Sequence, residues 1–180
     1  MKDVLINALR ENTLCEIYQD ESDRSSFHVG FIINIDETNN TVLYERIDSD
    51  GKYCGMYFVK INSILSIKIN DKYLKKIELL TKYYNQERKL FTTNEKSLLE
   101  NVLNFCMKSN LIVELYLCDT EYCISTGIIT EIAIDSVTIK CIDEYGEEDG
   151  ADVIDIRAIV SVSFDTSESN VVELVSKIKI

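Results

Sequence analysis

The sequence predicts a mainly β protein with flanking helices, built as two repeated small five-stranded barrels, each preceded by a helix. Three observations predict this fold. Short alternating runs rich in Ile, Val, Thr and Tyr are typical of strands. Apolar residues at helical spacing precede each set of runs. The pattern of the first half also recurs in the second half. We expect one repeat at 1–90 and the other at 91–180, each with a C-terminal helix.

The two halves align along their length, with gaps only where hairpin turns are expected. Three blocks carry the alignment: Cys15–Tyr18 with Val113–Tyr116, Gly30–Ile35 with Gly127–Ile132, and Ile47–Gly51 with Ile142–Gly146. Both copies contain Ile-Asp-x-x-Gly-x-x-x-Gly, which ends at Gly55 and at Gly150. This recurrence indicates a turn geometry that the fold requires. Its glycines are expected to have positive φ, or to lie where another strand comes close.

The first repeat begins with a predicted helix at 2–11, whose apolar face holds Val4, Leu5, Ala8 and Leu9. Alternation then predicts strands at 14–19, 27–35, 41–47, 55–61 and 63–69. Turn-forming residues separate these runs, as in Asp36–Asn40. Apolar residues at helical spacing predict a closing helix from Asp71 to about Arg88.

The second repeat follows the same order. A helix is predicted at 98–108, with Thr93 or Asn94 as its N-cap. Strands are predicted at 111–118, 121–132, 136–142, 150–156 and 158–164, and a weaker helical pattern covers 167–177. No Gly/Ser linker separates the repeats, so we expect them to pack through helices.

The composition limits the function classes. The chain has 31 acidic and 19 basic residues and a net charge of −12, which favours basic partners and disfavours nucleic acid and anionic lipid. No apolar run is long enough to span a membrane, and the beginning of the chain lacks the apolar core of a signal peptide. We therefore expect a cytoplasmic protein whose six cysteines are thiols.

A helix followed by five bent strands in such a short repeat resembles the Sm-like small β-barrel. The resemblance is closest at Phe27–Ile32, followed by Asp36 and Asn40, where the family has a strand-bending glycine and an Asp-x-x-x-Asn turn. In that family the turn Asn and a later Arg-Gly turn bind RNA. Here the later segment, Val59–Ile64, lacks both the arginine and the glycine, and the second copy lacks the polar turn residues. A PRC-type or other SH3-like barrel fits nearly as well.

No catalytic, cofactor or metal motif is recognisable. The single histidine, His28, lies in a predicted strand without a spaced partner, so we interpret it as a surface or half-buried strand residue. The cysteines form no C-x-x-C pair, and only Cys118 and Cys123 are close in sequence, which disfavours zinc. The six cysteines lie at positions 15, 54, 106, 118, 123 and 141, and most of them are interpreted as small apolar fillers. We expect no enzyme and no cofactor.

Acidic turns recur in both repeats and are the leading binding candidates. They comprise Asp48 and Asp50 in the first copy, and Asp143, Glu144, Glu147, Glu148 and Asp149 in the second. A calcium loop counted from Asp48 would need a glutamate at its twelfth position, where Val59 stands. Solvated hairpin tips explain the acidic residues equally well.

Three functional hypotheses follow. The first is a protein-binding module, such as an acidic immunity or antitoxin-like protein that neutralises a basic partner. The second is Sm-like binding of RNA or nucleotides, with its candidate residues at Asp36, Asn40, Lys60, Lys75 and Lys76. The lysines of the closing helix are equally well explained as its solvated face. The third hypothesis is self-assembly into a homo-oligomer through exposed edge strands.

Overall fold

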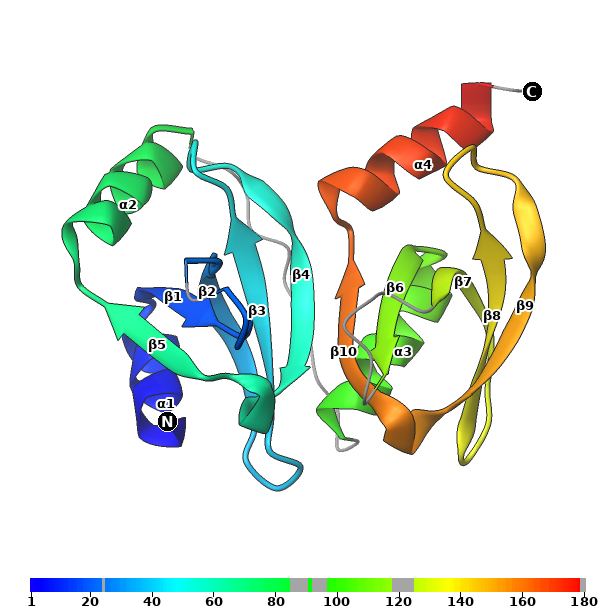
Figure 1. Ribbon diagram of the computed structural model, residues 1–180, viewed down its shortest axis with the longest axis horizontal. Helices are drawn as coiled ribbons and strands as arrows, with labels where there is room; N and C mark the ends of the chain where they lie inside the picture. Colours follow the sequence, from blue (N-terminus) through cyan, green and yellow to red (C-terminus); the bar gives the residue numbers. More distant parts are fainter. Residues whose placement is uncertain (24, 85–90, 92–96, 118–124, 179–180) are drawn as a thin grey trace. The chain divides into compact units, whose positions relative to one another are not determined.

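The computed structural model describes residues 1–23, 25–84, 91, 97–117 and 125–178. The chain forms two compact units, Met1–Leu98 and Leu99–Ile180. Each unit contains five antiparallel strands together with helices that precede and follow them (Figure 1). The prediction of a mainly β protein with flanking helices is confirmed. None of the described helices combines the length and apolarity needed to cross a membrane.

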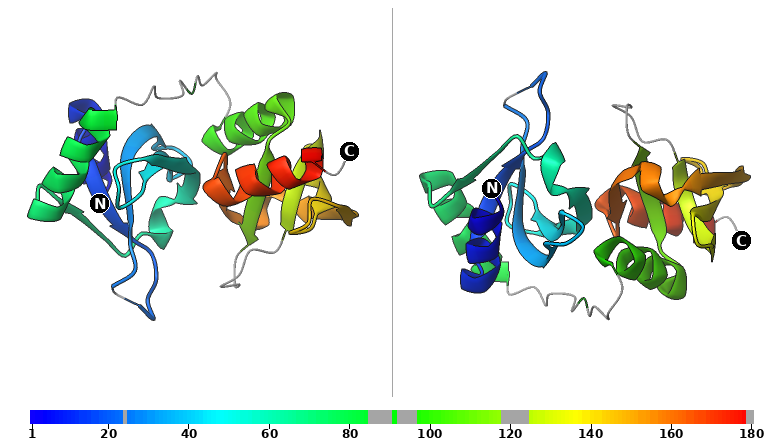
Figure 2. Two further views of the ribbon diagram at one scale, coloured as in Figure 1. Left: turned by 90° about the horizontal axis from the view of Figure 1, so that it is seen from above. Right: turned by 90° about the horizontal axis from the view of Figure 1, so that it is seen from below.

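The first unit starts with α1, whose apolar spacing and αL-capping asparagine favour a short helix. Its elements are α1 (Lys2–Glu11), β1 (Leu14–Tyr18), β2 (His28–Asp36), β3 (Thr41–Ile47), β4 (Tyr53–Lys60), the 3₁₀ turn η1 (Ile61–Ser63), β5 (Ser66–Ile69) and α2 (Lys72–Tyr84). The strands lie in the order β5-β1-β2-β3-β4. The described residues between β1 and β2 form a loop that projects from the unit (Figure 2).

The second unit repeats this succession of elements. They are α3 (Leu98–Ser109), β6 (Ile112–Leu117), β7 (Ser125–Ile132), β8 (Ser136–Ile142), β9 (Glu148–Asp155), the 3₁₀ turn η2 (Ile156–Ala158), β10 (Ile159–Phe164) and α4 (Ser167–Ile178). Its strands lie in the order β10-β6-β7-β8-β9. The residues expected to cap α3, Thr93 and Asn94, lie outside the described part of the chain, as does the segment 121–124.

The expected closed barrels are not found, because the strands of each unit form an open series. In the strand order, β5 and β4 are not neighbours, and neither are β10 and β9. A sheet closes into a barrel only when its strands tilt relative to the barrel axis and their hydrogen-bond register is staggered, so that the first and last strands pair. In the first unit β5 has only four residues, and all four pair with Cys15–Tyr18 of β1. The strands predicted to end at Ile61 and Ile156 instead end before these residues, which begin the 3₁₀ turns.

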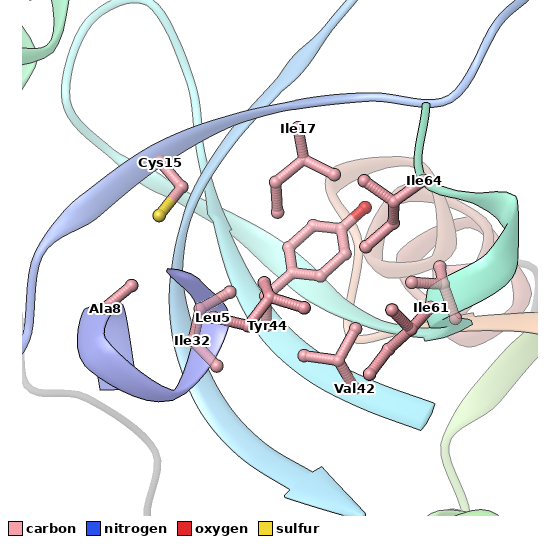
Figure 3. Packing of buried hydrophobic residues seen from close by; sticks show 10 residues of the cluster. Leu5, Ala8, Cys15, Ile17, Ile32, Val42, Tyr44, Ile61 and Ile64 are labelled. Carbon is pink, nitrogen blue, oxygen red and sulfur yellow. The ribbon is translucent and has the colours of Figure 1, made fainter. Parts of the chain in front are cut away.

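Two hydrophobic cores lie on opposite faces of the first sheet. In the first core, Leu5 and Ala8 of α1 pack with Cys15, Ile32 and Tyr44 (Figure 3). The second core contains α2 residues and the alternate strand residues: Leu14, Val29, Phe31, Ile47, Leu74 and Ile77. Because side chains alternate across a strand, Leu14 and Cys15 point to different faces. Val4 and Leu9, expected on the buried face of α1, are each 37% exposed and lie at its margin.

The β3–β4 and β8–β9 turns have the same geometry. The Asp48 amide donates to the Lys52 carbonyl at 2.8 Å, and the Asp143 amide donates to the Glu147 carbonyl at 2.9 Å. The third residue after each aspartate is a glycine with φ of 82° or 76°, which is the left-handed position of a type I turn with a bulge. The expected positive φ of the recurring glycines is found at Gly51, Gly55, Gly146 and Gly150.

Other backbone features correspond between the units as well. Asn12 after α1 and Asn110 after α3 both have left-handed φ, at 53° and 52°. Gly30 pairs with Arg46, and Gly127 pairs with Cys141. A β-carbon at either glycine would lie within 2.5 Å of a carbonyl oxygen on the neighbouring strand. Close approach of the neighbouring strand therefore explains why glycine stands at both positions.

Candidate functional site

The acidic turns use their first aspartate to build the turn. The Asp48 Oδ1 accepts hydrogen bonds from the amides of Asp50 at 2.9 Å and Lys52 at 2.8 Å. The Asp143 Oδ1 accepts from Tyr145 at 3.0 Å and Glu147 at 2.8 Å. The Asp50 and Glu144 side chains, in contrast, are exposed. Of the predicted binding residues, Asp48 and Asp143 therefore have a structural role in shaping the hairpins.

The second unit presents a longer acidic surface than the first. From Asp143 to Asp155 the sequence has seven acidic residues and no basic residue. Most of β9 is exposed, with Val153 72% exposed in its centre, and Tyr145 in the turn is 59% exposed. Glu148 forms an ion pair with Lys140 at 2.6 Å. We call Asp143–Asp155 the acidic hairpin.

The structure brings together part of the predicted RNA site. Asn40 has left-handed φ, and its side-chain amide donates to the Asn62 Oδ1 at 2.7 Å, which joins the β2–β3 loop to η1. Lys60 pairs with Thr41 at the same end of the unit. The Asp36 carboxylate accepts from the backbone and side chain of Asn39 at 2.9 and 2.7 Å. Asp36 therefore orders its own turn.

The two remaining residues of the RNA hypothesis lie elsewhere. Lys75 and Lys76 are exposed on α2, whose Leu74 and Ile77 face the second core. In Figure 1, α2 and the β2–β3 loop are at opposite ends of the first unit. The structure therefore does not assemble Lys75 and Lys76 with Asn40 and Lys60 into one surface.

A polar cluster that sequence reasoning missed adjoins the first core. Figure 3 shows the Tyr44 hydroxyl pointing between Ile17 and Ile64, away from α1. This hydroxyl donates to the Gln19 Oε1 at 3.2 Å and lies 2.7 Å from the His28 Nδ1. Because its one proton goes to Gln19, the hydroxyl accepts from His28, and the neutral imidazole is the Nδ1–H tautomer.

Further side chains complete this cluster. Gln19 donates to the Ser63 hydroxyl at 3.2 Å, and Ser63 donates to the Lys60 carbonyl at 2.7 Å. The Tyr57 ring stacks on Tyr44 with centroids 5.6 Å apart and an interplanar angle of 14°. We call the following six residues the polar cluster: Gln19, His28, Tyr44, Arg46, Tyr57 and Ser63.

Arg46 is the charged member of the polar cluster. Its guanidinium donates to the Tyr57 hydroxyl at 3.0 Å and lies 5.4 Å from the centre of that ring. Burial and the nearby Arg46 charge lower the pKa of His28 to about 4. Burial also raises the pKa of Tyr44 far above its usual value. At neutral pH the cluster therefore holds one positive charge on Arg46 beside neutral aromatic side chains.

Comparing the residue types at equivalent positions of the two halves could have revealed this cluster. Its residues are scattered along the sequence, so no spacing motif marks them. At the paired strand positions, however, the second unit has Ile139 for Tyr44, Cys141 for Arg46 and Asp152 for Tyr57. A polar and aromatic set in only one copy indicates that the fold does not require it.

The described cysteines are free thiols: Cys15, Cys54, Cys106 and Cys141. Burial raises the pKa of Cys15 to about 11 and also raises that of Cys106. Cys118 and Cys123, weighed as zinc ligands, lie outside the described residues. Within the described residues, no group of three or more His, Cys, Asp or Glu side chains is placed to hold a metal ion.

Comparisons with known proteins do not assign a family. No family model, no curated protein and no solved structure matches the chain.

Proposed function

We propose that the chain is a non-enzymatic protein-binding module whose acidic hairpin binds a basic partner, as an immunity or antitoxin-like protein would. The supporting observation is a run of seven acidic residues along β9 and its turn, five of them exposed, with no basic residue among them. A one-sign surface accelerates the encounter with an oppositely charged partner and favours it over acidic competitors. The exposed Tyr145 and Val153 supply apolar contact area within this surface.

For the fold, we propose two tandem Sm-like or SH3-like small-barrel units that remain open. The shared succession of helix, five strands and helix supports this proposal. So do the matching strand orders and the glycines at matched close approaches. The free thiols of the described cysteines suit a reducing compartment such as the cytoplasm.

The proposed function is tested by neutralising the acidic hairpin without disturbing its turn. The test variant combines Glu144→Gln, Glu147→Gln and Asp149→Asn, which spare the turn-building Asp143. The matched control removes the same number of charges from exposed positions in the first unit, with Glu11→Gln, Glu21→Gln and Glu37→Gln. Each protein is immobilised and exposed to lysate of the source organism over a series of salt concentrations.

We expect a basic protein to bind the wild type and the control, and to bind less well as salt rises. The variant of the acidic hairpin should no longer bind this basic protein. Equal retention by the hairpin variant, or retention that does not change with salt, would contradict the proposal.

RNA binding is a second candidate, favoured by the hydrogen bond between Asn40 and Asn62 that joins the β2–β3 loop to η1. If RNA binds there, Asn62→Ala should weaken a low-salt mobility shift with single-stranded RNA. The double variant Lys75→Gln, Lys76→Gln should leave it unchanged, because these lysines lie on α2. A weaker shift with the lysine variant but not with Asn62→Ala would place the RNA on α2. The absence of a mobility shift with the wild type and with both variants would remove RNA binding as a candidate.

A further inference from the structure

We propose that Arg46 is the anchor of an oxyanion-binding site in the first unit, which takes a small ligand through a carboxylate or phosphate group. The site belongs to the polar cluster and does not depend on the acidic hairpin of the second unit. It is carried by the placement of Arg46, by the absence of an ion-paired carboxylate at Arg46 within the described residues, and by the aromatic side chains that hold it.

Strand geometry makes room for the Arg46 side chain. On one side Arg46 pairs with Gly30, which has no side chain. On the other side the register between β3 and β4 shifts between Glu45 and Ile47, so a bulge lies opposite Arg46. Bulges re-aim side chains and are common beside functional sites. Arg46 is consequently half-buried while still in contact with solvent.

The guanidinium of Arg46 has unused hydrogen-bonding capacity. Arginine has five N–H donors, and here one donates to the Tyr57 hydroxyl at 3.0 Å. Within the described residues, no carboxylate lies within ion-pair distance of Arg46, although the chain has a net charge of −12. The exposed Arg157, in contrast, donates from Nε to the Asp155 Oδ1 and from Nη2 to the Asp155 Oδ2, a bidentate pair. A half-buried guanidinium without a carboxylate is suited to a bidentate oxyanion ligand.

The neighbouring aromatic side chains hold the guanidinium in place. The Tyr57 ring is fixed by stacking on Tyr44, and the His28 ring meets its edge at a centroid distance of 5.0 Å. Tyr44 is fully buried and bonded to His28 and Gln19. An ordered anchor loses less side-chain entropy when a ligand binds. The polar cluster therefore preorganises Arg46.

The second unit lacks the chemistry of this site at its matching positions. Cys141 stands in place of Arg46, and its sulfur lies 3.7 Å from the Ser125 hydroxyl. Asp152 stands in place of Tyr57, where a carboxylate would repel an anion. The described residues of the second unit therefore do not reproduce this site, which provides an internal comparison.

His28 provides a unique spectroscopic probe, because it is the only histidine in the chain. Inorganic phosphate and, separately, acetate are titrated into the full-length protein against chloride at matched ionic strength. The readout is the imidazole Cε1–H signal in a proton–carbon correlation spectrum. An anion bound to Arg46 reduces the positive field that lowers the pKa of His28. It should therefore shift this signal and raise that pKa.

We expect a saturable shift with at least one of the two anions. A response to phosphate alone identifies a phosphate-bearing ligand, and a response to acetate alone identifies a carboxylate. The shift should disappear in Arg46→Gln and persist in Arg157→Gln, which removes an exposed arginine instead. No saturation with either anion, or an unchanged shift in Arg46→Gln, would overturn the proposal.

A second variant keeps the test decisive if Arg46→Gln does not fold. Arg46→Lys retains the charge but loses the planar pair of donors that grips an oxyanion. We expect the dissociation constant of the responding anion to rise by about tenfold. An unchanged dissociation constant in Arg46→Lys, measured by the same His28 signal, would contradict bidentate binding at Arg46.

Discussion

A β-carbon added to Gly51 would lie 2.4 Å from the Cβ of Leu80, so α2 crosses the β3–β4 turn at a distance that only glycine permits. The second unit has the same relationship, because a β-carbon on Gly146 would lie 2.9 Å from the Cα of Ser176 on α4. In each unit the closing helix is therefore docked on the tip of the same hairpin.

The first prediction compares two glycines of one hairpin. Gly146→Ala and Gly150→Ala both place alanine at positive φ, at 76° and 79°. Only the first collides with a helix, since nothing lies within 4 Å of a β-carbon at Gly150. We expect Gly150→Ala to cost about 1 kcal/mol of unfolding free energy from backbone strain, and Gly146→Ala to cost about 3 kcal/mol. Urea denaturation of the two variants measures the difference. Equal losses of unfolding free energy would mean that α4 moves away from the added methyl group without cost.

The second prediction concerns the turn aspartate of the acidic hairpin. Both amide bonds to Asp143 end on the same oxygen, Oδ1, which an asparagine also provides. Asp143→Asn should therefore preserve stability, whereas Asp143→Ala should lose about 1 kcal/mol. Thermal unfolding of both variants checks this prediction. Equal losses would show that the charge of Asp143, rather than its oxygen, supports the turn.

The third prediction concerns pH. His28 has a pKa of about 4 in the folded protein, against an ordinary value of 6.5. The unfolded chain therefore binds more protons in this interval. Stability should be complete above pH 6.5 and fall as the pH decreases toward 4, by about 3 kcal/mol in all.

His28→Asn provides the control, because it removes the titrating group and keeps a donor near Tyr44. Its free energy of unfolding should change less between neutral and mildly acidic pH than that of the wild type. Denaturant titrations at both pH values give this difference. Parallel losses in the two proteins would contradict the neutral, buried state of His28.

The fourth prediction concerns thiol reactivity. Cys15 is buried and its thiol has a pKa of about 11, whereas Cys54 is half-buried. The thiolate is the reactive form, so the shift from 9.0 lowers the reactive fraction of Cys15 by about a hundredfold. Iodoacetamide should modify Cys54 before Cys15, as followed by peptide mass mapping. In urea the two should react at similar rates, and early labelling of Cys15 in the folded protein would contradict its burial.

Much of the secondary structure could be predicted because local patterns determine it. The strand at 41–47 and the helix at 2–11 have the expected bounds, since each has a clear apolar period. The 3₁₀ turns at Ile61–Ser63 and Ile156–Ala158 were missed because their apolar residues continue the strand pattern. The prediction of closed barrels was wrong. Strand order depends on pairing between distant segments, and the alternation of apolar residues does not encode that pairing.

The functional residues were harder to predict. The sequence indicated acidic turns as binding candidates. It did not show that the side-chain oxygens of Asp48 and Asp143 would accept hydrogen bonds from backbone amides of their own turns. His28 is a half-buried strand residue, within what the sequence interpretation allowed, but its contact with Tyr44 was not foreseen. Residues such as His28, Arg46 and Tyr57 meet only through the register of three strands. That register becomes known only when the sheet is assembled.

The burial of His28 has a consequence for the whole molecule. Imidazole is the one side chain whose ordinary pKa allows a change of charge across the acidity range of living cells. The only imidazole of this chain has been moved out of that range. In the folded protein this side chain therefore stays neutral under mild acidification, which acts through His28 only by lowering stability. Any attraction that the acidic hairpin exerts will respond to ionic strength rather than to His28 protonation.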